Sequence, residues 1–273
     1  MSNPFPIGVV TDEISRTLSE ALDIASSWGL SRFELREGGT HRFPGFTPDE
    51  ISALDSAIAE GARITAVSPG ILKNHADDET ATELALTDTL PRTIELAARF
   101  ECPLIIVFGF EMTDNEDPAN RTKAMRAFER AATMAADAGM QIAIENEPNF
   151  WVDRSGPAAE MLTEIGHPAL ALNWDPANLH WGGHLPTQED VELVRPHLAN
   201  LHVKDYAPSR PEAPWFPVGQ GETPWADLFS WVLSGEHSLG HVTLETHCEP
   251  LVESSRQSLE GMRRLLSNVA DSA

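Results

Sequence analysis

Short apolar runs alternate along this chain with longer stretches of helical period, and this alternation limits the folds that are open to it. The runs are residues 7–14, 32–36, 64–68, 104–110, 141–146, 170–175, 198–205 and 241–246. Most are rich in β-branched residues and apolar on both faces, which is typical of parallel strands covered by helices. The helix-period segments are residues 17–28, 47–61, 80–100, 118–138, 157–165, 187–193, 224–233 and 253–266. Eight such units predict an α/β fold, the (β/α)8 TIM barrel, with an open doubly wound sheet as the alternative.

The length of the chain agrees with one barrel. It has 273 residues, and barrels of this kind commonly use roughly 250 residues as one unit. No linker rich in Pro, Gly or Ser divides it, so residues 1–273 are predicted to form a single domain. One helix start is marked clearly, because Thr47 precedes Pro48 and the acids Asp49 and Glu50, the pattern of an N-cap with proline in the first turn.

Charge and cysteine content exclude several classes of protein. The formal net charge is −23, and such a field repels nucleic-acid phosphate and anionic membranes. Cys102 and Cys248 show no C-x-x-C spacing and are expected to be free thiols in a reducing compartment. The beginning of the chain lacks the features of a signal peptide, and no apolar run approaches the ~20 residues of a membrane span. We therefore expect a cytoplasmic protein without nucleic-acid or membrane partners.

Four apolar runs in the second half each end on a side chain that can bind a metal ion. These residues are Glu145, Asp175, His202 and Glu245. Side chains two residues apart on a strand point the same way, and the carboxyl ends of barrel strands meet at one face, where barrel enzymes place their chemistry. Three carboxylates and one imidazole, with no sulfur, suit Mn²⁺ or Mg²⁺, with Co²⁺ or Zn²⁺ as possible replacements. The pattern predicts one divalent ion at this face.

These runs and their flanks carry a family resemblance. The chain resembles the sugar phosphate isomerase/epimerase superfamily, the xylose isomerase-like TIM barrels that also include the apurinic endonuclease type. The matching segments occur in order over nearly the whole chain: IGVVTDEIS, GLSRFELR, IAIENEP, LNWDPANL, LHVKD, VGQGETPW and VTLET. The resemblance implies that the four strand-end residues ligate one divalent ion, most commonly Mn²⁺.

The resemblance also implies a reaction on a small ketose or polyol-derived ketone. One glutamate removes a proton beside the carbonyl group, and the other returns one to a cis-enediolate that the ion stabilises. Glu145 and Glu245 occupy the matching positions. A dehydratase or lyase of the inosose or dehydroshikimate type is the main alternative, because it begins with the same proton abstraction.

Two further functions remain open. An apurinic endonuclease would need more metal ligands and a basic groove, which the charge of −23 and the presence of only three lysines argue against. A non-catalytic carbohydrate-binding barrel is the other, and four intact candidate ligands speak against it. Relatives differ in oligomeric state, so a homo-oligomer is possible.

Five residues are candidates for substrate contact: Lys204, Asn178, His75, Arg36 and Asn146. Lys204 shares a strand face with His202, and its alternative role is a salt bridge to Asp205 or a neighbouring acid at the barrel rim. Many members of the family carry histidine where this chain has Asn178, and asparagine cannot transfer protons at neutral pH. This difference leaves the substrate open, since relatives that act on inosose or hydroxypyruvate are also compatible.

Several other residues are candidates for supporting roles. Glu13 and Glu34 are expected either to orient a ligand or to pair with Arg36 or Arg16. Tryptophans in the later loops either wall the pocket or pack in the core. The segment 208–221 reads as a long irregular loop, and its G-x-G is not a nucleotide-binding motif because no helix opens on it after a strand.

Overall fold

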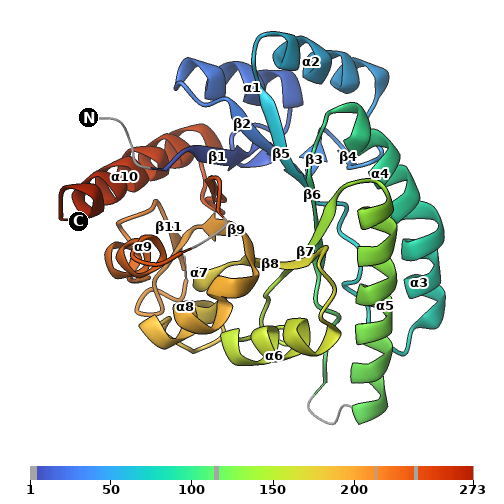
Figure 1. The fold of residues 1–273 in the computed structure, drawn as a ribbon. Helices are drawn as coiled ribbons and strands as arrows, with labels where there is room; N and C mark the ends of the chain where they lie inside the picture. Colours follow the sequence, from blue (N-terminus) through green and yellow to red (C-terminus); the bar gives the residue numbers. More distant parts are fainter. Residues whose placement is uncertain (1–4, 114–116, 213, 237–238, 273) are drawn as a thin grey trace.

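The computed structural model describes residues 5–113, 117–212, 214–236 and 239–272. Its centre is a closed barrel with the strand order β1-β12-β9-β8-β7-β6-β5-β2 (Figure 1). Because β1 pairs in parallel with both β12 and β2, the sheet closes on itself, which confirms the TIM barrel and excludes the open sheet. The barrel strands are β1 Ile7–Val10, β2 Arg32–Leu35, β5 Arg63–Val67, β6 Leu104–Phe108, β7 Gln141–Glu145, β8 Leu170–Trp174, β9 Leu198–Val203 and β12 Val242–Leu244.

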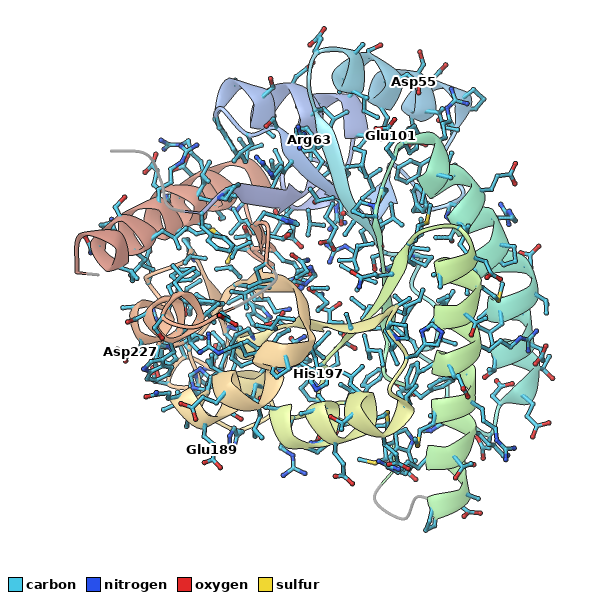
Figure 2. All side chains as sticks on the ribbon, viewed as in Figure 1. Asp55, Arg63, Glu101, Glu189, His197 and Asp227 are labelled. Atoms are coloured by element: carbon cyan, nitrogen blue, oxygen red, sulfur yellow. The ribbon has the colours of Figure 1, made fainter. Side chains whose placement is uncertain are left out.

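Helices surround the barrel and return the chain to its starting end. They are α1 Leu18–Ser27, α2 Pro48–Ala59, α3 Glu79–Leu84, α4 Leu90–Arg99, α5 Pro118–Asp137, α6 Ser155–Ile165, α7 Pro176–Trp181, α8 Gln188–Val194, α9 Trp225–Leu233 and α10 Leu251–Ser272. Charged side chains such as Asp55, Glu189 and Asp227 project from the outer faces of these helices (Figure 2). None of the described helices is long and apolar enough to cross a membrane.

The two faces of each strand enter different environments. On β6, Ile105 and Val107 belong to the large apolar core beneath the helices, whereas Leu104 and Ile106 belong to a small separate cluster with Ala143. The alternation of side chains along a strand produces this division. The small cluster fills the interior of the barrel near the amino ends of the strands, and polar side chains fill the interior towards the carboxyl ends.

The structure departs from the sequence-based expectations at several element ends. The run 7–14 is a strand only to Val10, and Thr11–Glu13 forms the 3-10 turn η1, because the side chains beyond Val10 bend towards Arg36. The expected helix 80–100 contains a π-helical turn, η2 Ala85–Thr89, between α3 and α4. The helix start at Thr47 is confirmed as a capping box with Glu50.

Three short elements were not anticipated. Helix α7 begins directly after β8, where the Asp175 carboxylate accepts hydrogen bonds from two backbone N–H groups at the helix start. Two small hairpins project beyond the barrel. They are β3 Glu37–Gly38 with β4 His41–Arg42, and β10 Asp205–Tyr206 with β11 Trp215–Phe216. The second hairpin gives order to part of the segment 208–221 that was expected to be irregular.

Candidate active site

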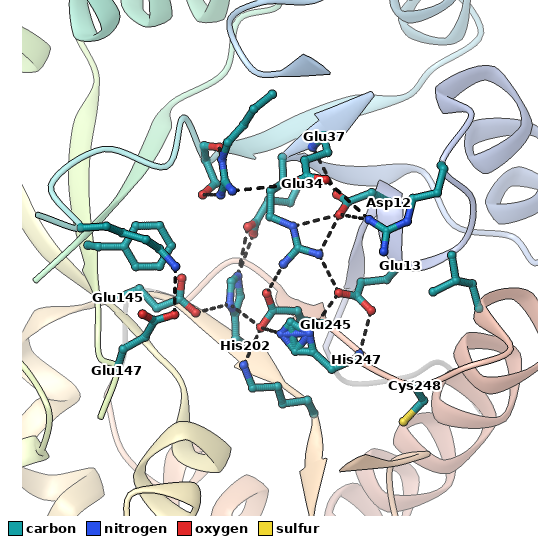
Figure 3. A pocket seen from close by; sticks show the side chains of 18 of the residues that line it. Asp12, Glu13, Glu34, Glu37, Glu145, Glu147, His202, Glu245, His247 and Cys248 are labelled. Carbon is teal, nitrogen blue, oxygen red and sulfur yellow. Dashed lines mark hydrogen bonds and ion pairs between the residues drawn. The ribbon is translucent and has the colours of Figure 1, made fainter. Parts of the chain in front are cut away.

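A cavity of about 350 Å³ lies at the carboxyl end of the barrel strands. Its wall combines residues that follow seven different strands, so chain segments far apart in sequence meet there (Figure 3). The cavity contains acids and cations in close alternation, including Glu145, His202, Lys204 and Glu245. A site of this composition can bind an ion and move protons.

The four predicted metal ligands converge beside this cavity. Glu145 ends β7, Asp175 follows β8, His202 lies on β9 and Glu245 follows β12. One donor atom from each residue lies within 4.8 Å of every other, and all four side chains are buried. The four therefore form a cluster of oxygen and nitrogen donors of the size that a single divalent ion requires after a small contraction.

Asp175 shows that the cluster fits a cation. Its Oδ1 accepts hydrogen bonds from the N–H groups of Ala177 and Asn178. Its Oδ2 is buried and accepts no hydrogen bond among the described residues, although the Lys204 ammonium nitrogen lies 2.7 Å away. A buried carboxylate oxygen is costly unless it meets a positive charge. The helix start thus fixes one oxygen of Asp175, and the other faces a positive charge, which Lys204 supplies in the metal-free protein.

A chain of buried hydrogen bonds inside the barrel orients the His202 ring. Thr243 Oγ1 donates to Asn200 Oδ1 at 3.0 Å, and Asn200 Nδ2 donates to Glu34 Oε2 at 3.2 Å. Glu34 Oε2 lies 3.0 Å from His202 Nε2, while His202 Nδ1 lies 3.1 Å from Glu145 Oε1. A carboxylate on one ring nitrogen directs the other towards an ion. Glu34, one of the two expected supporting acids, has this position.

The buried charged groups of the site shift one another's pKa values. Burial alone would lower the pKa of His202, but Glu34 and the two cluster glutamates outweigh it and hold the pKa well above its ordinary value. Burial raises the pKa of Glu34, and it raises that of Asp175 despite the attraction of Lys204. Without an ion the His202 ring is therefore protonated. Binding of an ion requires the neutral imidazole and would release that proton.

Glu245 is held by two cations. Arg36 Nη1 donates to Oε1 at 2.6 Å, and Lys204 Nζ donates to Oε2 at 2.8 Å. Burial raises the pKa of Glu245, but Lys204 and His202 more than offset this and bring it well below the ordinary value. Glu245 is consequently a fixed, charged carboxylate in the metal-free protein.

Lys204 and Arg36 lie where the sequence placed them, at the cavity wall. The Lys204 ammonium pairs with the neighbouring acids Asp175 and Glu245, as its alternative role predicts, although Asp205 is not its partner among the described residues. Arg36 bridges Glu245 to Asp12 and Glu13 at 2.6–2.7 Å. Both cations thereby balance the charge of the cluster, and their contact with substrate stays a prediction.

The three other predicted substrate contacts lie outside the cavity lining. Asn146 and Asn178 are buried, and Asn178 Nδ2 donates to the Asn146 carbonyl at 2.9 Å. Asn146 in turn exchanges hydrogen bonds with the backbone of Asp175 at 2.7 and 2.9 Å. His75 is 42% exposed and lies beside Glu111. The two asparagines support the ligand Asp175, and a substrate-binding role for all three residues stays a prediction.

Several lining residues were not identified from the sequence. Asp12 lay within a run read as a longer strand, so its turn towards Arg36 was hidden. His247 is different, because its strand parity with Glu245 does predict it at the carboxyl face; it lies there beside Glu13 with a left-handed φ of 54°. Arg42 comes from the β3–β4 hairpin and Lys73 from a loop, and no sequence pattern reveals the path of either segment.

The aromatic residues divide between core and rim. Trp174 is fully buried in the core. Trp215 lies on β11, its ring centre 5.7 Å from that of His247 and 5.3 Å from Lys204 Nζ. Cys102 and Cys248 are free and buried, and burial raises the pKa of each thiol to about 12. Neither cysteine is therefore a nucleophile at neutral pH.

The chain is similar in sequence and in fold to known proteins. A protein of Actinoplanes sp., 2-epi-5-epi-valiolone 7-phosphate 2-epimerase, is 26% identical over 221 residues, which cover 79% of this chain and 78% of that protein. The crystal structure of the probable 3-DHS dehydratase of Bacillus anthracis has a TM-score of 0.76 at 18% identity, over 93% of this chain and 97% of that one.

A second similar structure contains a metal ion. It is a xylose isomerase-like TIM barrel protein of Mycobacterium smegmatis in complex with magnesium, with a TM-score of 0.72 at 16% identity and 98% coverage of both chains. The model of the xylose isomerase-like TIM barrel family matches residues 22–267. This match spans the barrel from α1 to α10 and includes all four clustered ligands, so the chain belongs to the xylose isomerase-like TIM barrel family.

Proposed function

We propose that this protein is a divalent-metal-dependent isomerase or epimerase of a small ketose or polyol-derived ketone. One observation carries the proposal: two buried glutamates, from strands separated by β8 and β9 around the barrel, meet in one ligand cluster beside one cavity. The similarity to an epimerase supports the same reaction class. The oxygen-rich donor set favours Mn²⁺ among the ions that would fit, with Mg²⁺, Co²⁺ and Zn²⁺ as alternatives.

Glu145, Asp175, His202 and Glu245 would hold the ion. When bound, the ion supplies Lewis-acid polarisation of a substrate carbonyl group, which acidifies the neighbouring C–H bond. Glu145 and Glu245 approach from different strands, so one can remove a proton from carbon and the other can return one. Arg36 and Lys204 keep Glu245 charged and fixed, which prepares it to accept a proton and not to donate one at the start of the reaction.

The proposal is tested by proton exchange in D₂O. The Mn²⁺-loaded protein is incubated with ketoses, inososes and hydroxypyruvate, and products are analysed by NMR. We expect deuterium at the carbon beside the carbonyl group without loss of water. Absence of exchange with every compound would contradict the proposal. A dehydrated product would instead establish the lyase alternative, which the similarity to the Bacillus anthracis structure favours.

Matched variants test the roles of the two glutamates. Glu245→Gln and Glu145→Gln each keep an oxygen ligand but remove the base, and general-base loss typically costs about 10²–10⁴-fold in rate. We expect turnover to fall by at least 100-fold while the stoichiometry of bound Mn²⁺ stays the same. In a two-base epimerase each variant should also lose deuterium exchange mainly with one of the two epimers. Equal turnover in wild type and both variants would exclude the assigned roles.

We further propose that the protein is cytoplasmic and that its partner is a small sugar or polyol ketone. A homo-oligomer is compatible with this proposal. Two free buried thiols support a reducing compartment. Cell fractionation tests the location, and light scattering coupled to size exclusion measures the oligomeric state. Recovery of the protein from the periplasmic or extracellular fraction would contradict the assignment.

A further inference from the structure

One arginine of the cavity has donors that the protein itself does not use. Arg42 lies on β4 and lines the same cavity as Glu145 and Glu245. Its Nε donates to the Ser68 carbonyl at 3.1 Å, and its Nη2 donates to Ser68 Oγ at 3.2 Å. A guanidinium has five N–H donors. The remaining donors of Arg42 have no hydrogen-bond acceptor among the described residues.

Three other cations of the cavity each donate a hydrogen bond to at least one carboxylate. Arg36 contacts three carboxylates at 2.6–2.7 Å. Lys204 contacts two at 2.7–2.8 Å. Lys73 donates to Glu147 at 3.4 Å and lies over the ring of Phe108.

Arg42 has a weaker counter-charge than these cations. The one carboxylate within 4 Å of it in the described chain is Glu37, at 3.5 Å, and no hydrogen bond joins the two. Glu37 is shared, because it also lies 3.5 Å from Arg16. Arg16 also lines the cavity, but its side chain is 60% exposed and is held only by ion pairs of 3.5 and 3.9 Å. Among the described residues, Arg42 is therefore the cavity arginine that is fixed by hydrogen bonds to neutral groups and still keeps unused donors.

The fold fixes the position of this guanidinium. Phe43 follows it directly and Phe46 comes shortly after; both are buried and pack edge to face with ring centres 5.3 Å apart, which anchors the hairpin. Gly70 has a φ of +74°, and a Cβ at this glycine would lie 2.5 Å from Arg42 Nε. A larger residue at position 70 would displace the guanidinium. Ser68 then holds two of its donors, so the side chain is positioned before any ligand binds.

A fixed guanidinium with spare donors recognises planar or tetrahedral oxyanions in preference to neutral hydroxyl groups. The side chain of Arg42 is 32% exposed, so a ligand in the cavity can reach it. The net charge of −23 repels anions at a distance. An anionic ligand would consequently need a local positive group beside its binding site, and Arg42 is placed to be that group.

We propose that Arg42, oriented by Ser68, binds an anionic group of the substrate, a carboxylate or a phosphate, at the side of the cavity away from the reacting carbon. This inference rests on the proposed isomerase function and narrows its substrate to acidic ketoses or acidic polyol ketones. The cavity volume of about 350 Å³ suits one such small molecule.

The test compares matched pairs of anionic and neutral probes by calorimetry on the Mn²⁺-loaded protein. Hydroxypyruvate is paired with dihydroxyacetone, and fructose 6-phosphate with fructose, so the two pairs distinguish carboxylate from phosphate. We expect at least one anionic probe to bind tenfold or more tightly than its neutral partner. The ratio of the two affinities, anionic to neutral, should fall most of the way to one in Arg42→Met, and Arg42→Lys should retain part of it.

Controls separate this subsite from the folding of the protein and from the reaction. Arg92→Met removes an exposed arginine outside the cavity and should keep the wild-type ratio. If Arg42→Met does not fold, Ser68→Ala tests the same contact and should lower the ratio. A wild-type ratio near one in both pairs, or an unchanged ratio in Arg42→Met, overturns the inference. An Arg42-dependent ratio without any exchange in D₂O would refute the isomerase function and leave the subsite intact.

Discussion

At the scale of single residues, Glu34 is a buried acid that contacts the proposed metal cluster without belonging to it. It is fully enclosed, accepts a hydrogen bond from Asn200, and lies 3.0 Å from His202 Nε2. Such carboxylate–imidazole pairs fix the ring and its tautomer, and their loss typically lowers metal affinity about 10–100-fold. The sequence placed Glu34 near the site but could not choose between this role and pairing with an arginine.

Replacing Glu34 tests the pairing directly. We expect Glu34→Gln to weaken Mn²⁺ binding about tenfold or more, because the amide cannot balance charge on the imidazole. Titration calorimetry measures the affinity. Asp55→Asn removes one charge from the outer helix α2 and should leave the affinity unchanged. Equal affinities in Glu34→Gln and wild type would show that Glu34 does not act on the ion.

A histidine at the opposite end of the barrel should govern stability in acid. His241 precedes β12, its Nε2 is buried without a hydrogen-bond partner among the described residues, and burial together with Arg32 lowers its pKa to about 4. The unfolded chain takes up a proton near pH 6.5, whereas the folded protein does so only near pH 4. Stability from this residue is thus present above pH 6.5 and is lost as the pH falls towards 4.

The size of this effect follows from the shift. The difference between the His241 pKa of 6.5 in the unfolded chain and about 4 in the folded protein lowers the free energy of unfolding by about 3 kcal/mol as the pH falls from 6.5 to 4. Urea denaturation at a series of pH values measures it, and His241→Gln should flatten the curve over that range. A variant that loses stability in acid as steeply as wild type would assign the effect to other groups.

At the scale of elements, the glycine loop after β11 is built around one carboxylate. Asp205 accepts hydrogen bonds from the N–H groups of Gly219, Gly221 and Thr223 at 2.8–3.1 Å. Asp205 follows Lys204, whose carbonyl accepts a hydrogen bond from the Trp225 indole at 2.8 Å. The G-x-G pattern therefore serves to bring backbone donors close to Asp205, and this loop braces the strand end that carries Lys204.

A methyl group in this loop should disturb both stability and the site. A Cβ at Gly221 would overlap the Asp205 carboxylate, and overpacking of this kind typically costs about 1–3 kcal/mol. We expect Gly221→Ala to unfold at lower urea concentration and to lower kcat/KM. Gly156→Ala, near the start of α6 with nothing within 4 Å of the added atom, is the matched control and should be neutral or stabilising.

At the scale of the whole molecule, an ion would join four strands that are distant in the chain. Its ligands follow β7, β8 and β12 or lie on β9. Ion binding to the folded state alone stabilises it by about 2.7 kcal/mol at a concentration 100 times Kd. It also relieves the repulsion among buried carboxylates, in a protein whose net charge is already −23.

Thermal unfolding should report this coupling. We expect saturating Mn²⁺ to raise Tm by about 5–10 °C, and EDTA to reverse the shift. Asp175→Asn keeps an oxygen that can cap α7 but removes the charge, so its Tm should respond much less to Mn²⁺. A shift of equal size in this variant would place the ion elsewhere.

Local patterns were sufficient for much of the fold and for the centre of the site. Strand parity and run ends pointed to the four clustered ligands, because the direction of a side chain on a strand depends only on its position. The same reasoning was less accurate at β1, where the strand ends at Val10 and the following turn carries Asp12. Asn146 adjoins the end of β7, and Asn178 and His75 lie further along the chain after β8 and β5, yet their side chains do not line the cavity.

The sequence by itself determined the alternation of strands and helices and the family, and it singled out the four residues that meet in the cluster, since each depends on short-range patterns. Only the tertiary structure decided which other charges meet them. Arg36 contacts Glu245 across 209 positions of sequence, and Glu34 contacts His202 across 168. Arg42 enters the cavity from a hairpin that no sequence pattern predicted. Closure of the barrel brings these groups together, and burial then sets their charge and hydrogen bonding, which no local stretch of sequence encodes.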